Sequence, residues 1–235
     1  IMKTAIYYAS DAYKIENNQI MGRRVAGNSF LKGYFQYINS REFLVYSRTK
    51  VEAEEFVSLA RKLGRDEEFK YINFHNTAAL KDADLLFYPG PDIYVQSKVR
   101  SFFKDNSWSI CGITHTTSSV KVMESIKSLV TSPVSPWDAL ICTSLAVKSN
   151  VMRILDVEED NLRNRLQAKQ FIRPELPVIP LGIHSDEFNF EKEDRLIARN
   201  DLNIEDQEIV ILYVGRLSFH AKSNPFPMYK SLEEV

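Results

Sequence analysis

Residues 109–144 contain the pattern that decides the fold. Ser109-Ile-Cys-Gly-Ile113 is a short apolar run, and Ala139-Leu-Ile-Cys142 is a second one. Between them, Ser119–Val130 has apolar residues at helical spacing and is followed by Pro133. A strand, a helix and a second strand in this order are typical of two parallel strands joined by a crossover helix. The stretch therefore predicts one β-α-β unit.

The same alternation extends through residues 1–185. Strands are expected at Lys3–Ala9, Glu42–Tyr46, Lys70–Phe74, Leu85–Tyr88 and Pro177–Pro180, and helices at residues 21–38, 50–63, 95–103, 144–155 and 161–171. Repeated alternation of strands and helices indicates an α/β fold, with a doubly wound, mainly parallel, Rossmann-like sheet that helices cover on both faces.

Composition narrows the class of function. The 235 residues contain 30 Lys and Arg against 31 Asp and Glu, a net charge of -1, which gives no electrostatic reason to expect a nucleic-acid partner. No signal-peptide pattern or membrane-length apolar run occurs, and Cys111 and Cys142 fit neither zinc nor redox spacing. We expect a cytoplasmic protein, with at most weak membrane-surface contact through Arg163, Arg165 and Lys169.

Loops at the carboxyl ends of the strands are where such sheets bind ligands. After the first strand, Gly22, Arg23 and Arg24 open a helix whose free N–H groups, with two guanidinium groups, suit a phosphate or sugar hydroxyls. The alternative is a pair of solvent-exposed arginines at a helix entry. No Gly-x-Gly-x-x-Gly follows this strand, which argues against a dinucleotide cofactor.

Two further loops contain candidate side chains. Thr114 and His115 follow the strand at residues 109–113, where the imidazole suits a hydrogen bond to a substrate hydroxyl or a proton transfer. A structural histidine is the alternative. Ser144 follows the strand at 139–142, and its hydroxyl suits either the cleft or the cap of the next helix.

The stretch from Glu208 to Lys222 predicts a second domain. Ile209–Val214 is a continuous apolar run, as expected of a strand buried on both faces, and Gly215, Arg216 and Lys222 follow it. An arginine that binds in a bidentate way and a lysine suit a diphosphate. We expect residues 1–185 to form one domain, 186–207 a linker, and 208–235 the truncated start of a second α/β domain.

Two segments together resemble a known family. Pro177-Val-Ile-Pro-Leu-Gly-Ile-His-Ser-Asp-Glu-Phe188 and Ile209-Val-Ile-Leu-Tyr-Val-Gly-Arg-Leu217 resemble the interdomain region of group 1, family 4, retaining glycosyltransferases. Residues 21–26 and 112–115 also resemble acceptor-domain loops of that family. The resemblance implies the GT-B fold, in which two Rossmann-like domains face each other across a cleft. Residues 1–185 would then bind the acceptor, and those from 208 onward would open the donor domain.

The resemblance also implies roles. Arg216 and Lys222, next to Gly215, match the pair that holds the donor diphosphate, and His115 matches a catalytic-site histidine that contacts the transferred sugar. The implied reaction moves a hexosyl group, with retention and without a metal cofactor, from a nucleotide sugar to a hydroxyl of a glycan, lipid or small-molecule acceptor. Ser223, His184 and the missing Glu-x7-Glu signature depart from the family pattern. We therefore expect this chain to be inactive alone and to form an oligomer, if any, through its unpaired strand.

Two other functions stay open on the sequence alone. A GT-B-type epimerase would interconvert a free nucleotide sugar without an acceptor. A non-catalytic domain would bind a glycan and would not respond to a nucleoside diphosphate.

Overall fold

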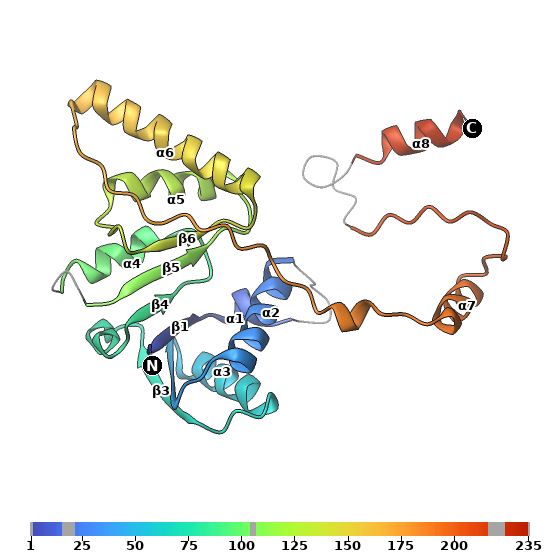
Figure 1. Cartoon of the computed structure of the whole chain (residues 1–235), viewed down its shortest axis with the longest axis horizontal. Coiled ribbons are helices and arrows are strands. Elements are labelled where there is room, and N and C mark those ends of the chain that lie inside the picture. The colour runs from blue at the N-terminus through green and yellow to red at the C-terminus, as the bar shows by residue number, and fades with distance from the viewer. Residues whose placement is uncertain (1, 16–21, 104–106, 216–223, 235) are drawn as a thin grey trace. The chain divides into compact units, whose positions relative to one another are not determined.

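The computed structural model describes residues 2–15, 22–103, 107–215 and 224–234 (Figure 1). They form two compact units, Ile1–His184 and Ser185–Val235. The first unit contains the whole sheet and both cavities discussed below, so it is the part of the molecule that positions the candidate site.

The first unit is built on one six-stranded sheet in which every neighbouring pair is parallel. Its order, β3-β2-β1-β4-β5-β6, reverses direction between β1 and β4, which makes this the topological switch point of a Rossmann-like fold. The predicted doubly wound α/β fold is confirmed. The strands are β1 (Thr4–Tyr8), β2 (Glu42–Ser47), β3 (Glu68–Asn73), β4 (Leu85–Phe87), β5 (Ser109–Ile113) and β6 (Ala139–Ile141).

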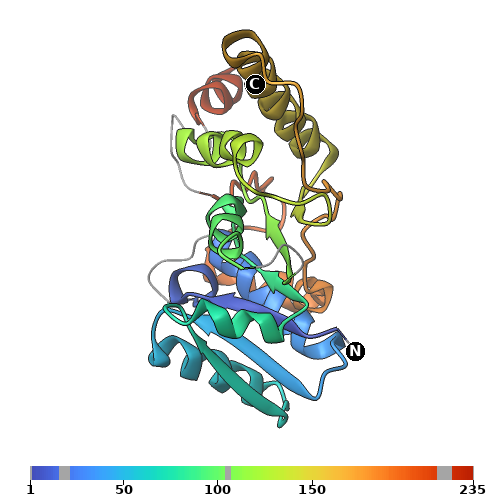
Figure 2. The same ribbon diagram turned by 90° about the vertical axis from the view of Figure 1, so that its left-hand side faces the viewer.

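Helices cover both faces of the sheet (Figure 2). Along β1, Ala5 and Tyr7 pack into one buried cluster, whereas Ile6 and Tyr8 pack into the other, because successive strand residues point to opposite faces. The first cluster takes residues from α4 (Ile93–Arg100), α5 (Val120–Thr131) and α6 (Leu145–Leu166), and the second from α1 (Ser10–Tyr13), α2 (Gly22–Tyr37) and α3 (Lys50–Lys62). A 3-10 turn, η1 (Thr77–Asp82), connects β3 to β4.

Side-chain caps explain where several helices begin. At α3, the Glu52 backbone N–H donates to the Thr49 hydroxyl while the Glu52 carboxylate accepts from the Thr49 backbone, a capping box that pairs two otherwise free N–H groups. Gly64, with φ of +77°, follows the end of this helix in the left-handed conformation that glycine adopts easily. Ser119 and Ser144 cap α5 and α6 more simply, because each hydroxyl accepts from a backbone N–H of the first turn.

The segment after α6 follows the edge of the sheet without forming the strand predicted at Pro177–Pro180. Only isolated parallel bridges occur there, between Ala139 and Glu175 and between Cys142 and Val178. The backbone N–H of Cys142 donates to the Pro177 carbonyl at 2.8 Å. This contact places the following residues beyond the carboxyl end of β6, next to the candidate site.

The second unit contains η2 (Ser185–Phe188), α7 (Lys192–Asp201) and α8 (Phe226–Glu233). The strand predicted at Ile209–Val214 is wrong for this structure: these residues form no regular element, and Ile209 is 92% exposed. A strand exists only when a neighbour accepts and donates its ladder hydrogen bonds, and none of the described residues pairs with this run. Its apolar composition alone therefore does not make it a strand.

Two glycines of α2 give a matched stability prediction. A Cβ at Gly27 would overlap the carbonyl oxygen of Ala12 and press on the Tyr13 ring, whereas a Cβ at Gly33 would meet nothing within 4 Å. We expect Gly27→Ala to lower the free energy of unfolding by about 1–3 kcal/mol through overpacking. We expect Gly33→Ala to raise it by about 0.5–1 kcal/mol, because alanine favours the helix.

Urea denaturation of both variants measures the two free energies. Equal shifts of the same sign would show that α1 does not pack against α2 through Gly27.

Candidate functional site

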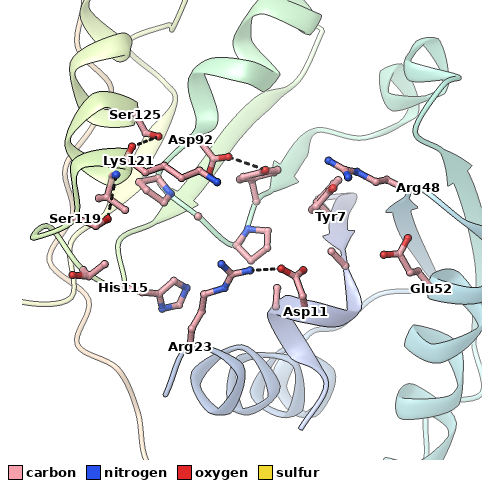
Figure 3. A pocket seen from close by; sticks show the side chains of 18 residues that line it. Tyr7, Asp11, Arg23, Arg48, Glu52, Asp92, His115, Ser119, Lys121 and Ser125 are labelled. Atoms are coloured by element: carbon pink, nitrogen blue, oxygen red, sulfur yellow. Dashed lines mark hydrogen bonds and ion pairs between the residues drawn. The ribbon is translucent and has the colours of Figure 1, made fainter. Parts of the chain in front are cut away.

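A cavity of about 570 Å³ lies at the carboxyl ends of β1, β2, β4 and β5, at the switch point of the sheet (Figure 3). We call it the polar cavity. This is the position where open α/β sheets bind ligands, because the loops that leave neighbouring strands separate there. Its polar lining consists of Tyr7, Asp11, Arg23, Arg48, Glu52, Tyr88, Asp92, His115, Thr116, Ser119, Lys121 and Ser125.

Charges of both signs line the polar cavity. Arg23 Nη2 donates to Asp11 Oδ2 at 3.0 Å, and the Tyr88 hydroxyl donates to Asp92 Oδ2 at 3.1 Å. Figure 3 shows the Arg23 guanidinium between His115 and Asp11. A cavity with carboxylates, guanidinium groups and phenol hydroxyls offers both donors and acceptors, which suits a ligand with many hydroxyl groups.

His115 is held in a setting that favours the neutral imidazole. Burial lowers its pKa, the positive charge of Arg23 lowers it further, and a hydrogen bond with the backbone of Pro89 acts in the opposite direction. The pKa lies below the ordinary value of 6.5, so near pH 7 one ring nitrogen donates and the other accepts. Because the Pro89 carbonyl takes the N–H, the other ring nitrogen of His115 can accept a hydrogen bond from a substrate hydroxyl.

Titration of His115 is a test of this environment. Since the pKa is lower in the folded chain than in the unfolded one, the unfolded chain binds more protons between the two values. The contribution of His115 to the free energy of unfolding therefore becomes more favourable as pH increases through this window toward 6.5.

We expect Arg23→Gln to raise the His115 pKa and Arg23→Lys to leave it nearly unchanged, since only the first variant removes the charge.

Histidine side-chain NMR spectra recorded across pH measure these pKa values. Identical His115 titration curves in wild type and Arg23→Gln would contradict the electrostatic contribution of Arg23.

Two tyrosines at the polar cavity are kept as neutral phenols. Burial raises the pKa of Tyr7, although Arg48 acts to lower it by charge and by a hydrogen bond. Burial also raises the pKa of Tyr88 far above its usual value, and the negative charge of Asp92 adds to the effect. Both groups therefore remain hydrogen-bonding hydroxyls at any physiological pH.

A second cavity of about 410 Å³ shares His115 and Pro89 with the first, and we call it the apolar cavity. Its walls come from α2, from the ends of β4, β5 and β6, and from residues 179–182, which follow the bridge between Cys142 and Val178. Its other lining residues are Tyr13, Ala26, Gly27, Ser29, Phe30, Gly33, Tyr34, Phe87, Ile113, Ile141, Ile179, Pro180, Leu181 and Gly182.

Two of the residues predicted for the site line the polar cavity, namely Arg23 and His115. Thr114 does not line it, because it is buried and its backbone N–H and hydroxyl donate to the Ile141 carbonyl at 2.9 and 3.0 Å. Ser144 does not line it either, since its hydroxyl accepts from the Val147 N–H at 3.1 Å at the start of α6.

The remaining predicted residues lie elsewhere. Gly22 and Arg24 are on the first turn of α2 and line neither cavity, so of these three predicted residues Arg23 alone reaches one. Gly215 is exposed in the second unit. Arg216 and Lys222 lie outside the described residues.

Several lining residues were not predicted from the sequence. Arg48 follows β2 directly, and Asp92 follows the Pro-Gly-Pro turn after β4. The rule that loops at carboxyl ends of strands bind ligands applies to these two loops as well, and it would have identified both. Lys121, on the first turn of α5, could not be identified from its own stretch of sequence, because the tertiary packing of α5 brings it to this cavity.

In the part of the chain that the structure describes, no group of three His, Cys, Asp or Glu side chains is placed to hold a metal ion. Cys111 and Cys142 are free thiols. Among the same residues, no helix combines the length and apolarity needed to cross a membrane.

A scan against protein-family models gives no match, and a search of curated proteins gives none either. Among solved structures, Anabaena Alr3699/HepE in complex with UDP is similar with a TM-score of 0.53 and 11% identity, over 86% of this chain and 50% of that chain. Its complexes with UDP-glucose and with UDP and glucose give TM-scores of 0.51 and 12% identity over the same shares. This likeness shows a shared fold, and the chain spans half the length of that protein.

Proposed function

We propose that the chain belongs to a GT-B glycosyltransferase and contains its acceptor-side domain and the start of its donor domain. The observation that carries the proposal is the polar cavity with His115 at the switch point of a 3-2-1-4-5-6 sheet. Support comes from the shared fold with a protein solved with UDP, UDP-glucose, and UDP and glucose. The coarse function is transfer of a sugar from a nucleotide sugar to a hydroxyl.

The finer parts of the proposal rest on the sequence resemblance. They are membership of group 1, family 4, retention at the anomeric carbon, a hexosyl donor and the absence of a metal cofactor. A cytoplasmic location is proposed separately, from the sequence pattern described above. In this reaction the bond between the anomeric carbon and the diphosphate breaks, a bond to the acceptor oxygen forms, and the acceptor proton passes to the diphosphate. Arg216 and Lys222 would stabilise the charge that develops on the diphosphate.

The polar cavity supplies what the acceptor side of such a reaction needs. Neutral His115 donates its one N–H to the Pro89 carbonyl and can accept from a hydroxyl through its other ring nitrogen, while Asp92 and Glu52 can accept from further hydroxyls. Tyr7 adds a neutral hydroxyl, and Arg23 adds a donor near His115. Groups fixed in this way orient a hydroxyl toward the reacting carbon without further ordering cost.

The test is a product analysis with the full-length protein, because the 235-residue chain spans half the length of the HepE chain. UDP-glucose and other nucleotide sugars are incubated with and without an acceptor mixture. Transfer products that require an acceptor support the proposal, and we expect the 235-residue chain by itself to be inactive. Interconversion of the nucleotide sugar without an acceptor would indicate an epimerase. The absence of UDP or GDP binding in calorimetric titrations would indicate a non-catalytic glycan-binding domain.

A further inference from the structure

The apolar cavity is the feature from which we argue. Its volume of about 410 Å³ lies in the range of pockets that enclose small molecules. It adjoins the polar cavity, because His115 and Pro89 line both. The first unit thus offers a polar and an apolar compartment that meet at the imidazole.

Aromatic and aliphatic side chains form most of its walls. Phe30 of α2 stacks on Phe87 of β4, with ring centroids 4.1 Å apart and planes inclined by 13°. Ile113 and Ile141, at the ends of β5 and β6, contribute aliphatic surface, and Leu181 contributes more from the segment beyond β6. These walls offer dispersion contacts and few groups to which water can bind.

Two of the polar side chains at this cavity are paired within the protein. The Tyr13 hydroxyl donates to the Tyr7 carbonyl at 3.1 Å, and the Ser29 hydroxyl pairs with His184 Nε2 at 2.8 Å. Ordered water needs two to four polar partners, which such a lining does not provide. The cavity therefore favours an apolar group over a solvent-filled state or a second sugar.

We propose that the acceptor is amphiphilic, with an alkyl or aryl portion in the apolar cavity and a hydroxyl-bearing head in the polar cavity, where His115 meets the hydroxyl. The term acceptor rests on the proposed function. The apolar binding site does not, because it follows from the cavity alone.

Two glycines at the lining of the apolar cavity can each take a Cβ without steric overlap. Gly33, on α2, and Gly182, in the segment beyond β6, both line it, and a Cβ added at either meets nothing within 4 Å. Because they come from different elements, leucine substitutions at the two positions are two independent ways to reduce the cavity. Gln36 is exposed on the same helix as Gly33 and lines neither cavity, so Gln36→Leu is the matched control.

The test measures binding of hexyl, heptyl and octyl β-glucosides, each below its micelle-forming concentration, to the full-length protein without nucleotide. Burial of one methylene contributes about 0.8 kcal/mol, so each added methylene should tighten binding up to about fourfold. We expect Gly33→Leu and Gly182→Leu to abolish this dependence on chain length, and Gln36→Leu to retain it. Far-UV circular dichroism and thermal unfolding show that the variants are folded.

Binding that does not depend on chain length in the wild type would overturn the proposal, as would an unchanged dependence in both cavity-filling variants. An unchanged dependence in both variants would also follow if another protein segment occupied the apolar cavity and the alkyl chain bound elsewhere. Failure of the glycosyltransferase proposal looks different. In that case the dependence on chain length persists, but no sugar is transferred to any glucoside.

Discussion

Asp138→Ala should lower the free energy of unfolding by about 3–5 kcal/mol, the largest effect on stability that we expect from a single substitution in this chain. Its carboxylate oxygens lie 2.6 Å from Nη1 and Nη2 of Arg100, with side chains 0% and 4% exposed. The same carboxylate accepts from the backbone N–H groups of Ile110 at 2.9 Å and Ser135 at 2.8 Å. Its removal leaves the buried Arg100 guanidinium without a counter-charge and two backbone N–H groups without their acceptor.

The buried pair ties together three parts of the first unit. Arg100 ends α4, Ile110 is in β5, and Asp138 immediately precedes β6. A loss of this size is a large fraction of the 5–15 kcal/mol that typically separates folded and unfolded domains. We therefore expect Asp138→Ala to fold poorly at 37 °C and Arg100→Ala to behave similarly.

The control for this prediction is the exposed pair Lys70–Asp82, whose atoms are 2.5 Å apart and whose side chains are 43% and 52% exposed. Solvent screens such pairs, so Asp82→Ala should lower the free energy of unfolding far less than Asp138→Ala does. Urea denaturation compares the variants. Similar small losses for Asp138→Ala and Asp82→Ala would contradict a structural role of the buried pair.

His115→Ala should reduce kcat/KM for sugar transfer by the full-length protein by about 10²-fold or more while the protein stays folded. The imidazole is half-buried, lines both cavities and is neutral near pH 7, so it is placed to contact the reacting hydroxyl. Loss of a positioned general acid or base typically costs 10²–10⁴-fold in rate. His75→Ala is the control, since His75 is exposed and lines neither cavity.

A second substitution separates two roles of His115. Glutamine can form hydrogen bonds but does not transfer protons near neutral pH, so His115→Gln should recover activity if hydrogen bonding to the sugar is the role. Initial rates with a labelled nucleotide sugar measure all three variants. Rates equal to wild type in His115→Ala would remove His115 from the reaction.

Local sequence pattern was sufficient to locate the six strands, although it also predicted a strand at Pro177–Pro180 that does not form. The runs at Thr4–Tyr8 and Glu42–Ser47 are apolar and of strand length, and the helical spacing at Lys50–Lys62 begins at a capping box. These signals involve residues within one or two turns of each other, so they can be recognised without knowledge of the rest of the chain. The position of His115 follows in the same way from a strand that ends at Ile113.

The same kind of signal was insufficient at Ile209–Val214. Its apolar, β-branched composition predicts a buried strand, yet the run has no ladder partner in the described part of the chain and Ile209 is exposed. Strand formation depends on a neighbouring strand that the run itself does not contain. An apolar, β-branched composition therefore predicts a strand only where the fold also supplies a neighbouring strand.

The sequence by itself determined the α/β class, the parallel sheet and the placement of Arg23 and His115 near carboxyl ends of strands. Tertiary structure decided the chemistry of the two cavities. It placed Arg48, Asp92 and Lys121 around one cavity, and Phe30 and Leu181 on the walls of the other. These residues are far apart in the chain. Only the packing of helices on the sheet determines which side chains meet at the switch point, because such contacts join elements that carry no signal of each other in local sequence.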